Sequence, residues 1–203
     1  MNEEALRTLA AEIRACTSCP LHRGAKQAVP GEGSGESGIF FLGEAPGFNE
    51  DVQGRPFVGA AGQLLDELLA GVGLDRTKVF ITNVVRHRPP ENRDPLPDEV
   101  TACDVWLRRH LDVLKPRVIV TLGRHAMYKF FPNESISRVH GKVRRTQDSL
   151  VVFPMYHPAA ALHQPGLRDA LHADFAALAL FLATTPPTKQ PEELPVEQIT
   201  LFG

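Results

Sequence analysis

The sequence predicts an α/β protein, a three-layer α/β/α sandwich in which a central parallel four-stranded sheet lies between helices. Short apolar runs alternate along the chain with longer segments of helical periodicity, a pattern typical of parallel sheets with helical connections. The runs are apolar at consecutive positions, as expected for strands that are buried on both faces. The length of 203 residues and the hydrophobic content of 43% suit one domain with its own core.

The first part of the chain is expected to supply two helices and one strand. Residues 3–15 carry apolar side chains at helical spacing and predict a helix. The glycine-rich residues 31–38 predict a loop. The apolar run 39–42 predicts a strand that ends at a sharp turn, and residues 60–71, with leucines on one side, predict the next helix.

The second part continues the alternation of strands and helices. The apolar run 79–85 predicts a strand, and the prolines of residues 87–97 predict a loop. The remaining expected elements are a helix at 98–114, a strand at 118–122, a helix at 124–131, a strand at 150–153 and a helix at 167–183.

Composition limits the organisation and the partners of the chain. Residues 1–183 form the expected domain, and residues 184–203, rich in Pro, Thr and Glu, form an expected disordered tail. A net charge of −2 gives no overall basic field, so a DNA-binding chain of this kind must gather positive charge locally. No apolar stretch predicts a membrane span, and the N-terminus lacks the pattern of a signal peptide. The odd count of three cysteines favours metal-binding thiolates in a reducing cytoplasm over disulfides.

Polar side chains follow three of the predicted strands. Glu44 comes just after the first strand, Asn83 lies late in the second, and His157 follows the fourth. Ligands of parallel sheets bind beyond the carboxyl ends of the strands. We therefore expect these three side chains to meet at one site.

Each residue type suits a chemical role at such a site. Glu44 could activate or orient a water molecule, and Phe57 could stack on a flat ring. The carboxamide of Asn83 could present a donor and an acceptor to a pyrimidine edge, and His157 could donate to an oxygen that gains charge. Structural roles stay open for all four: a solvated acid, a core phenylalanine, a capping asparagine and a histidine satisfied by backbone.

The cysteines form a candidate metal site. Cys16 and Cys19 are spaced so that both thiolates could reach one metal from a single turn, and Cys103 lies on a later predicted helix, 16 residues after His87. Spacing does not separate a zinc ion, which accepts three cysteines and one histidine, from an iron–sulfur cluster. Ordinary buried thiols are the alternative.

Basic residues gather in three places and could supply local positive charge for DNA. The groups are Arg86, Arg88 and Arg93; Arg108 and Arg109; and Arg138, His140, Lys142, Arg144 and Arg145. Taken singly, each group is more typical of a solvated face.

Several motifs in order resemble one known family. They are Gly43-Glu44-Ala45-Pro46-Gly47, Gly54-Arg55-Pro56-Phe57-Val58-Gly59, Thr82-Asn83-Val84-Val85, Arg88-Pro89-Pro90-Glu91-Asn92-Arg93 and His157-Pro158-Ala159. This set resembles the family 4 uracil-DNA glycosylases, the iron–sulfur members of the uracil-DNA glycosylase superfamily. The resemblance covers residues 10–182, and several motifs in the right order are far more specific than any one alone.

The resemblance implies a base excision repair enzyme, acting as a monomer, that hydrolyses the N-glycosidic bond of deoxyuridine in DNA and leaves an abasic site. A flipped base would lie at the strand ends. In this family pattern Glu44 would position or activate water, Phe57 would stack on uracil, Asn83 would recognise its N3 and O4 edge, and His157 would stabilise charge on O2. The resemblance further implies backbone contacts to the base near Ala45 and a bracing pair formed by Glu50 and Asn92.

The chain departs from the family pattern at two positions. His87 stands where the family has a fourth cysteine, so we hypothesise that Cys16, Cys19, His87 and Cys103 hold a 4Fe–4S cluster, because imidazole ligation of cluster iron is known chemistry. A related branch that is trapped covalently on abasic DNA through a histidine also resembles the chain at this histidine, but the long basic loop of that branch is missing. Ala161 stands where a DNA-wedging leucine is common, which makes Leu162 the candidate wedge.

The C-terminal segment and the chain as a whole each allow a further interpretation. Residues Gln198 to Phe202 resemble the peptide that bacterial proteins insert into the DNA sliding clamp, and the alternative is a segment that packs on its own domain. For the whole chain, a non-catalytic iron–sulfur protein that binds damaged DNA and a zinc-binding α/β hydrolase of a different class stay open as alternatives.

Overall fold

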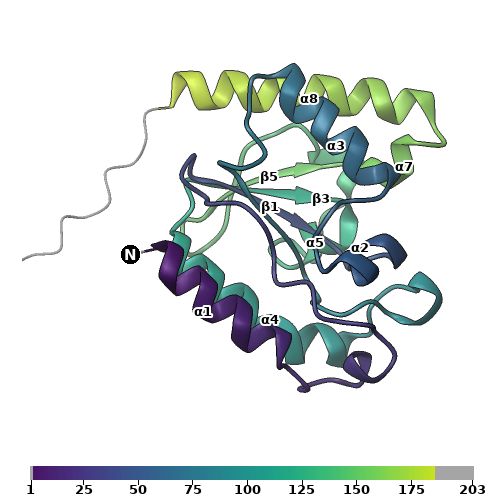
Figure 1. Cartoon of the computed structure of the whole chain (residues 1–203). Coiled ribbons are helices and arrows are strands. Elements are labelled where there is room, and N and C mark those ends of the chain that lie inside the picture. The colour runs from purple at the N-terminus through teal and green to yellow at the C-terminus, as the bar shows by residue number, and fades with distance from the viewer. Residues whose placement is uncertain (1, 186–203) are drawn as a thin grey trace, which may run out of the picture.

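The computed structural model describes residues 2–185 and consists of a sheet between two layers of helices (Figure 1). The strands are β1 (Ile39–Gly43), β2 (Phe80–Asn83), β3 (Val118–Leu122), β4 (Arg144–Arg145) and β5 (Val151–Met155). The α-helices are α1 (Asn2–Arg14), α2 (Phe48–Gln53), α3 (Ala60–Gly71), α4 (Pro97–Leu114), α5 (Arg124–Tyr128), α6 (Ile136–Val139), α7 (Pro158–Ala161) and α8 (Pro165–Thr184), with 3-10 turns at Pro20–Arg23 and Pro90–Asn92.

The sheet has the strand order β2-β1-β3-β5-β4. The first four strands in this order pair in parallel, which confirms the predicted parallel sheet. The prediction of four strands in total was wrong, because β4 adds a fifth, antiparallel strand beside β5. That strand is two arginines long, and such a short polar segment carries no apolar run by which a sequence pattern could detect it.

The two faces of the sheet bury separate apolar clusters. On β1, Phe40 and Leu42 pack with residues of α1 and α4, whereas Ile39 and Phe41 pack with residues of α3 and α8. Successive side chains of a strand point to opposite faces, so a strand between two helical layers must be apolar throughout, as the sequence pattern predicted. Figure 1 shows α1 and α4 side by side below the sheet and α3 with α8 above it.

Most of the longer elements match their predicted ranges. The strand predicted at 79–85 ends at Asn83, because Val84 and Val85, although buried, belong to the turn that follows. The short helices α2, α6 and α7 were not predicted, since four to six residues are too few to show a helical period. None of the helices between residues 2 and 185 has the length and apolar character that crossing a membrane requires.

The predicted tail can be compared with the structure only at its start. Helix α8 continues to Thr184, one residue beyond the expected domain boundary. The clamp-like segment Gln198 to Phe202 lies outside the described residues.

Candidate functional site

A cavity of about 350 Å³ lies where the carboxyl ends of the parallel strands meet. Its lining includes seven side chains or backbone segments singled out from the sequence: Glu44, Ala45, Glu50, Phe57, Asn83, Asn92 and His157. The other lining residues are Pro46, Gly47, Ala61, Pro89, Arg93, Asp94 and Ala159. The structure therefore brings together the base-binding candidates that the sequence distributes over more than 110 positions.

Glycine at the end of β1 allows two of these side chains to meet. Gly43 is paired with Asn83 across the β1–β2 ladder. A β-carbon on Gly43 would overlap the side-chain oxygen of Asn83 and would lie 2.6 Å from Cζ of Phe57. Only a residue without a side chain lets the carboxamide and the aromatic ring approach the strand end from the same side.

Phe57 is held in an uncommon backbone conformation. Its φ of +51° is in the left-handed region, which side-chain-bearing residues adopt only when the surroundings enforce it. Glu50 holds the loop of Phe57 in this conformation from one side. Its Oε1 accepts the main-chain N–H groups of Val58 and Gly59, both at 2.9 Å. Its Oε2 accepts the main-chain N–H of Gly47 at 3.1 Å. The aromatic wall of the cavity is thus fixed by a carboxylate that three backbone donors satisfy.

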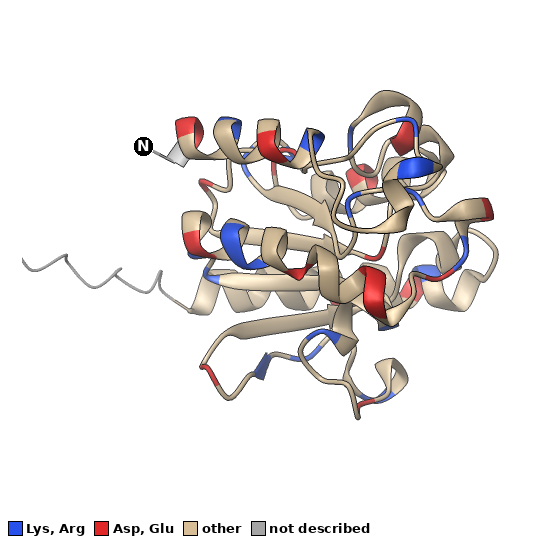
Figure 2. Cartoon of the chain, turned by 90° about the horizontal axis from the view of Figure 1, so that it is seen from below, with Lys and Arg blue, Asp and Glu red and all other residues tan. Residues whose placement is uncertain are grey.

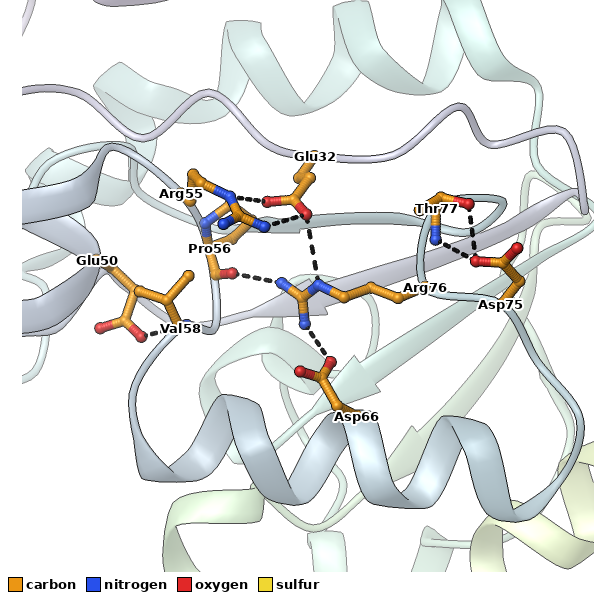
Figure 3. A network of polar contacts seen from close by, with 9 residues as sticks. All are labelled: Glu32, Glu50, Arg55, Pro56, Val58, Asp66, Asp75, Arg76 and Thr77. Atoms are coloured by element: carbon orange, nitrogen blue, oxygen red, sulfur yellow. Dashed lines mark hydrogen bonds and ion pairs between the residues drawn. The ribbon is translucent and has the colours of Figure 1, made fainter.

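A second network holds the segment before Phe57 (Figure 3). Arg76 donates to the carbonyl oxygen of Pro56 at 2.7 Å and to Asp66 at 2.6 Å. Arg55 forms a two-pronged ion pair with Glu32, with both N···O distances 2.8 Å. Because bidentate pairs restrict geometry as well as adding energy, the loop that carries the ring is fixed from its outer side too.

His157 lies against the Phe57 ring, with ring centroids 5.7 Å apart and planes inclined by 27°. Burial of the imidazole lowers the pKa of His157 to about 4, with Glu50 acting in the opposite sense and His125 adding to the decrease. The ring is therefore neutral near pH 7. Nδ1 accepts the main-chain N–H of Ala159 at 3.1 Å, so the proton of the neutral ring lies on Nε2, which makes Nε2 a hydrogen-bond donor.

Glu44 has a strongly perturbed carboxyl group. Burial, together with the negative charge of Asp94 and a hydrogen bond to it, raises the pKa of Glu44 to about 7, while Arg124 opposes the increase. His125 stands between the two acids, with Nε2 3.1 Å from Asp94 Oδ2 and 3.9 Å from Glu44 Oε2. A carboxyl group that titrates near neutrality inside a cavity is a candidate for acid–base chemistry.

Sequence reasoning missed Asp94 and His125. A signal for His125 was present, because it follows β3 by three residues and the other strand ends had been searched. Asp94 comes from the proline-rich loop after Asn92, and no local pattern indicates that this loop folds back toward Glu44.

Glu50 and Asn92, which were expected to pair with each other, each bind other groups in the structure. Both line the cavity, but Glu50 accepts the backbone donors described above and Asn92 Oδ1 accepts Nε–H of Arg88 at 2.7 Å. The guanidinium of Arg88 also lies 5.2 Å from the ring centre of Phe48, which is 60% exposed. The candidate wedge Leu162 follows α7 and is 40% exposed.

Ion pairs neutralise part of the basic groups among the described residues. Ion pairs join Arg93 to Glu99, Arg108 to Asp104, Arg109 to Glu12 and Arg144 to Glu134. Figure 2 shows basic and acidic residues interspersed along the helices, with no large area of one sign in that view. Less positive charge is therefore available for DNA than the sequence suggested, and among the described residues it comes from side chains outside these pairs, such as Arg88, Arg138, Lys142 and Arg145.

The three cysteines gather at the α1–α4 side of the sheet. They are unpaired, and they pack in the apolar cluster formed with α1 and α4. Nε1 of Trp106 donates to the sulfur of Cys16 at 3.2 Å. Backbone amides of Leu21 and His22 act to lower the pKa of Cys19, and that of Arg86 acts to lower the pKa of Cys103. Donors directed at sulfur favour the thiolate, the form that binds metal.

The thiols influence one another electrostatically. Burial raises the pKa of Cys103 and Cys19, and the charges of the other cysteines add to this increase. For Cys16, burial is outweighed by hydrogen bonds from Ser18 and Trp106 and by the charge of Arg86, so its pKa is lowered. Without a metal, a set of adjacent thiolates in the core is unfavourable.

His87 is buried, with 5% of its surface exposed. Burial and the neighbouring His22 lower its pKa, whereas Asp51 acts in the opposite sense. A neutral imidazole is the form that ligates a metal. His22, which sequence reasoning missed, lies beside both Cys19 and His87, and its Nδ1 is 2.6 Å from the carbonyl oxygen of Cys19.

Comparisons with known proteins agree with the geometry. Residues 30–180 match the model of the uracil DNA glycosylase superfamily. The chain is 47% identical over 192 residues to a type-4 uracil-DNA glycosylase of Sulfurisphaera tokodaii, an alignment that covers 90% of this chain and 87% of the relative. It is 46% identical over 193 residues to a type-4 uracil-DNA glycosylase of Archaeoglobus fulgidus, covering 91% and 97% of the two chains. The similarity to a type-5 uracil-DNA glycosylase of Pyrobaculum aerophilum is lower, 34% over 90 residues, which is 43% of this chain and 39% of that relative.

Proposed function

Because the chain belongs to the uracil DNA glycosylase superfamily, we propose that it hydrolyses the N-glycosidic bond of deoxyuridine in DNA and leaves an abasic site. The observation that carries the proposal is the single cavity in which Glu44, Phe57, Asn83 and His157 meet, within a chain that aligns over 90% of its length with type-4 relatives. Membership of the superfamily also removes the alternative of a zinc hydrolase of another class.

Recognition of uracil is assigned to the rigid side of the cavity. A base within a duplex cannot reach a recess at the strand ends, so the nucleotide must rotate out of the stack. The ring of Phe57 offers a flat apolar wall. Asn83, fixed on β2, would accept from N3–H of uracil and donate to O4, an arrangement that does not fit the reversed donor and acceptor of cytosine.

Bond cleavage is assigned to His157 and Glu44. When the bond between N1 of uracil and C1′ breaks, its electron pair leaves with the base, and the sugar becomes electron-poor. The Nε2–H of neutral His157 would donate to O2 of the departing uracilate and stabilise its charge. The carboxylate of Glu44 would orient a water molecule whose oxygen bonds to C1′ and whose proton is passed to the carboxylate or to solvent.

A 4Fe–4S cluster is the cofactor that we assign to Cys16, Cys19, Cys103 and His87. The N–H donor of Trp106 and the lowered pKa of Cys16 support a thiolate ligand at that position. The resemblance to the iron–sulfur members of the superfamily favours a multi-iron group over a single zinc ion. When bound, such a group would join α1, α4 and the turn after β2 as a structural element.

We also propose contacts to DNA outside the cavity, on the basis of the sequence. Leu162 is exposed after α7, where a side chain could fill the gap left by a rotated base. Covalent trapping on DNA is disfavoured, because the connection from His87 to Cys103 is short and lacks the basic loop that carries the trapping histidine in the related branch. Clamp binding by Gln198 to Phe202 would be tested by deleting the last six residues, and unchanged affinity for the clamp would discard it.

The activity is tested with oligonucleotides that contain one deoxyuridine. The purified chain is incubated with single- and double-stranded forms, and abasic sites are revealed by alkaline strand cleavage. Cleavage at uracil, and none in matched thymine or cytosine oligonucleotides, is expected for the wild-type chain, and slower cleavage at uracil is expected for Glu44→Gln. Retention of uracil-containing DNA without any cleavage would instead favour the non-catalytic damage-binding alternative.

A further inference from the structure

Arg86 is the largest side chain that is entirely buried, with 0% of its surface exposed. It lies in the turn after β2, between the base-recognising Asn83 and the candidate ligand His87. Burying an arginine without compensation is very unfavourable, because its guanidinium keeps its charge. The chain therefore needs a partner for this cation inside the core.

The described protein groups do not supply a sufficient partner. The guanidinium donates to the carbonyl oxygen of Asn83, but Nε has no hydrogen-bond partner among residues 2–185. Its Nη2 lies 3.3 Å from Nδ1 of His110, yet the same Nδ1 is 2.8 Å from the carbonyl oxygen of Trp106. A nitrogen that donates to that carbonyl cannot also accept from Arg86. Within the same range, no carboxylate forms an ion pair with Arg86, and the charges that act on it favourably are those of Cys103 and Cys16.

The main chain of the same residue also acts on the thiol site. The backbone amide of Arg86 lowers the pKa of Cys103, against the larger effect of burial, while the side chain reaches back to the carbonyl of Asn83. One residue thus joins the metal-ligand candidates to the strand end that carries the uracil-recognising carboxamide. A histidine in place of a fourth thiolate removes one negative charge from the centre, which lets a single guanidinium neutralise more of what is left.

We propose that Arg86 is the counter-cation of the metal–thiolate centre and that it fixes the position of Asn83 through its carbonyl oxygen. This inference rests on the proposed function, in its assignment of a metal centre to the three cysteines. It makes Arg86 a positioning residue, because it touches neither the base nor the reacting atoms.

The test compares purified Arg86→Met, Arg86→Gln and Arg86→Lys with the wild-type chain. Iron and acid-labile sulfide per chain, the rate of iron loss to a chelator and the kcat and KM of uracil excision are measured. The matched control is Arg117→Met, because Arg117 also has a buried Nε without a partner among the described residues but contacts the carbonyl oxygens of Leu182 and Thr185, remote from the thiols.

The neutral variants should lose iron about tenfold faster than the wild type, since removing one partner of a buried ion pair leaves the other uncompensated. Arg86→Lys should keep its iron, because it keeps the charge, but should excise uracil more slowly because an ammonium group cannot reproduce the reach of the guanidinium to Asn83. Arg117→Met should match the wild type in iron content. Should Arg86→Met fail to fold, Arg86→Gln and Arg86→Lys still separate charge from shape.

Two outcomes would overturn the inference: neutral variants with wild-type iron content and wild-type iron loss, or a wild-type chain that holds no iron. The first outcome leaves uracil excision by the wild type intact and so does not affect the glycosylase proposal. Conversely, a wild-type chain that holds iron, and loses it faster when Arg86 is neutralised, but cleaves no uracil-containing DNA would refute the glycosylase activity alone.

Discussion

Replacing Asp94 with asparagine should move the pH dependence of uracil excision toward lower pH. In the proposed mechanism the carboxylate form of Glu44 orients the water molecule, so activity should rise as pH increases through the pKa of Glu44. That pKa is raised to about 7 by burial and then by Asp94, against the opposing charge of Arg124. The Asp94→Asn substitution would remove the like charge, and it would also remove the carboxylate with which Arg124 forms an ion pair. Both changes favour the carboxylate form of Glu44.

The size of the effect follows from the titration of one group. With a pKa of about 7, the carboxylate fraction is roughly a tenth at pH 6 and roughly nine tenths at pH 8. The wild-type rate at about pH 6 should therefore be near a tenth of its rate at about pH 8. Burial, the largest cause of the raised pKa, persists in Asp94→Asn, so the shift is partial and this ratio should rise toward one without reaching it.

The assay is single-turnover excision from single-stranded DNA with one deoxyuridine, followed across the pH range for the wild type, Asp94→Asn and Glu44→Gln. Single turnover isolates bond cleavage from product release. Because the pKa of His157 is about 4, its titration does not contribute a limb near pH 7. A limb that stays at the wild-type position in Asp94→Asn, or one that persists in Glu44→Gln, would refute the assignment of the limb to Glu44.

Three further predictions concern recognition, the loop and the metal. Asn83→Asp should lower the rate of uracil excision about tenfold or more, since a buried acceptor replaces a donor, and should improve cytosine excision relative to uracil excision. Parallel assays on both bases measure this selectivity, and an unchanged selectivity would contradict the role of Asn83. Glu50→Gln should raise KM and lower the melting temperature by about 4 °C, because one of three backbone donors loses its acceptor. Steady-state kinetics and thermal unfolding measure the two effects. A wild-type KM would show that the Phe57 loop does not depend on this carboxylate. His87→Ala should lower the iron content of the purified protein, and full iron occupancy would exclude the histidine as a ligand.

The position of the cavity could be predicted from the sequence because the carboxyl ends of parallel strands lie at the same edge of the sheet. Glu44, Asn83 and His157 each follow an apolar run, and the direction of parallel strands places such residues together whatever the details of the helices. Phe57 is not at a strand end, and its place at the cavity depends on the left-handed backbone enforced by Glu50. The family resemblance, rather than periodicity, indicated its role.

Other features could not be predicted from local patterns. Arg86 was grouped with exposed basic residues, because an arginine next to other arginines is usually solvated, and only the fold shows it buried beside the thiols. The pairing of Arg93 with Glu99 and of Arg109 with Glu12 likewise depends on how the chain folds, so the expected basic surface was overestimated. Val84 and Val85 extended the predicted second strand because burial in a turn and burial in a strand give the same apolar signal.

The three strand-end groups around the cavity lie on β1, β2 and β5, with helical crossovers between these strands. During synthesis from the N-terminus, the ribosome must therefore release nearly the whole domain before the imidazole can join the acid and the carboxamide. A chain in which β5 has not yet docked lacks the imidazole that is proposed to stabilise the departing base. Full activity in base excision is therefore expected only after this last central strand has joined the sheet.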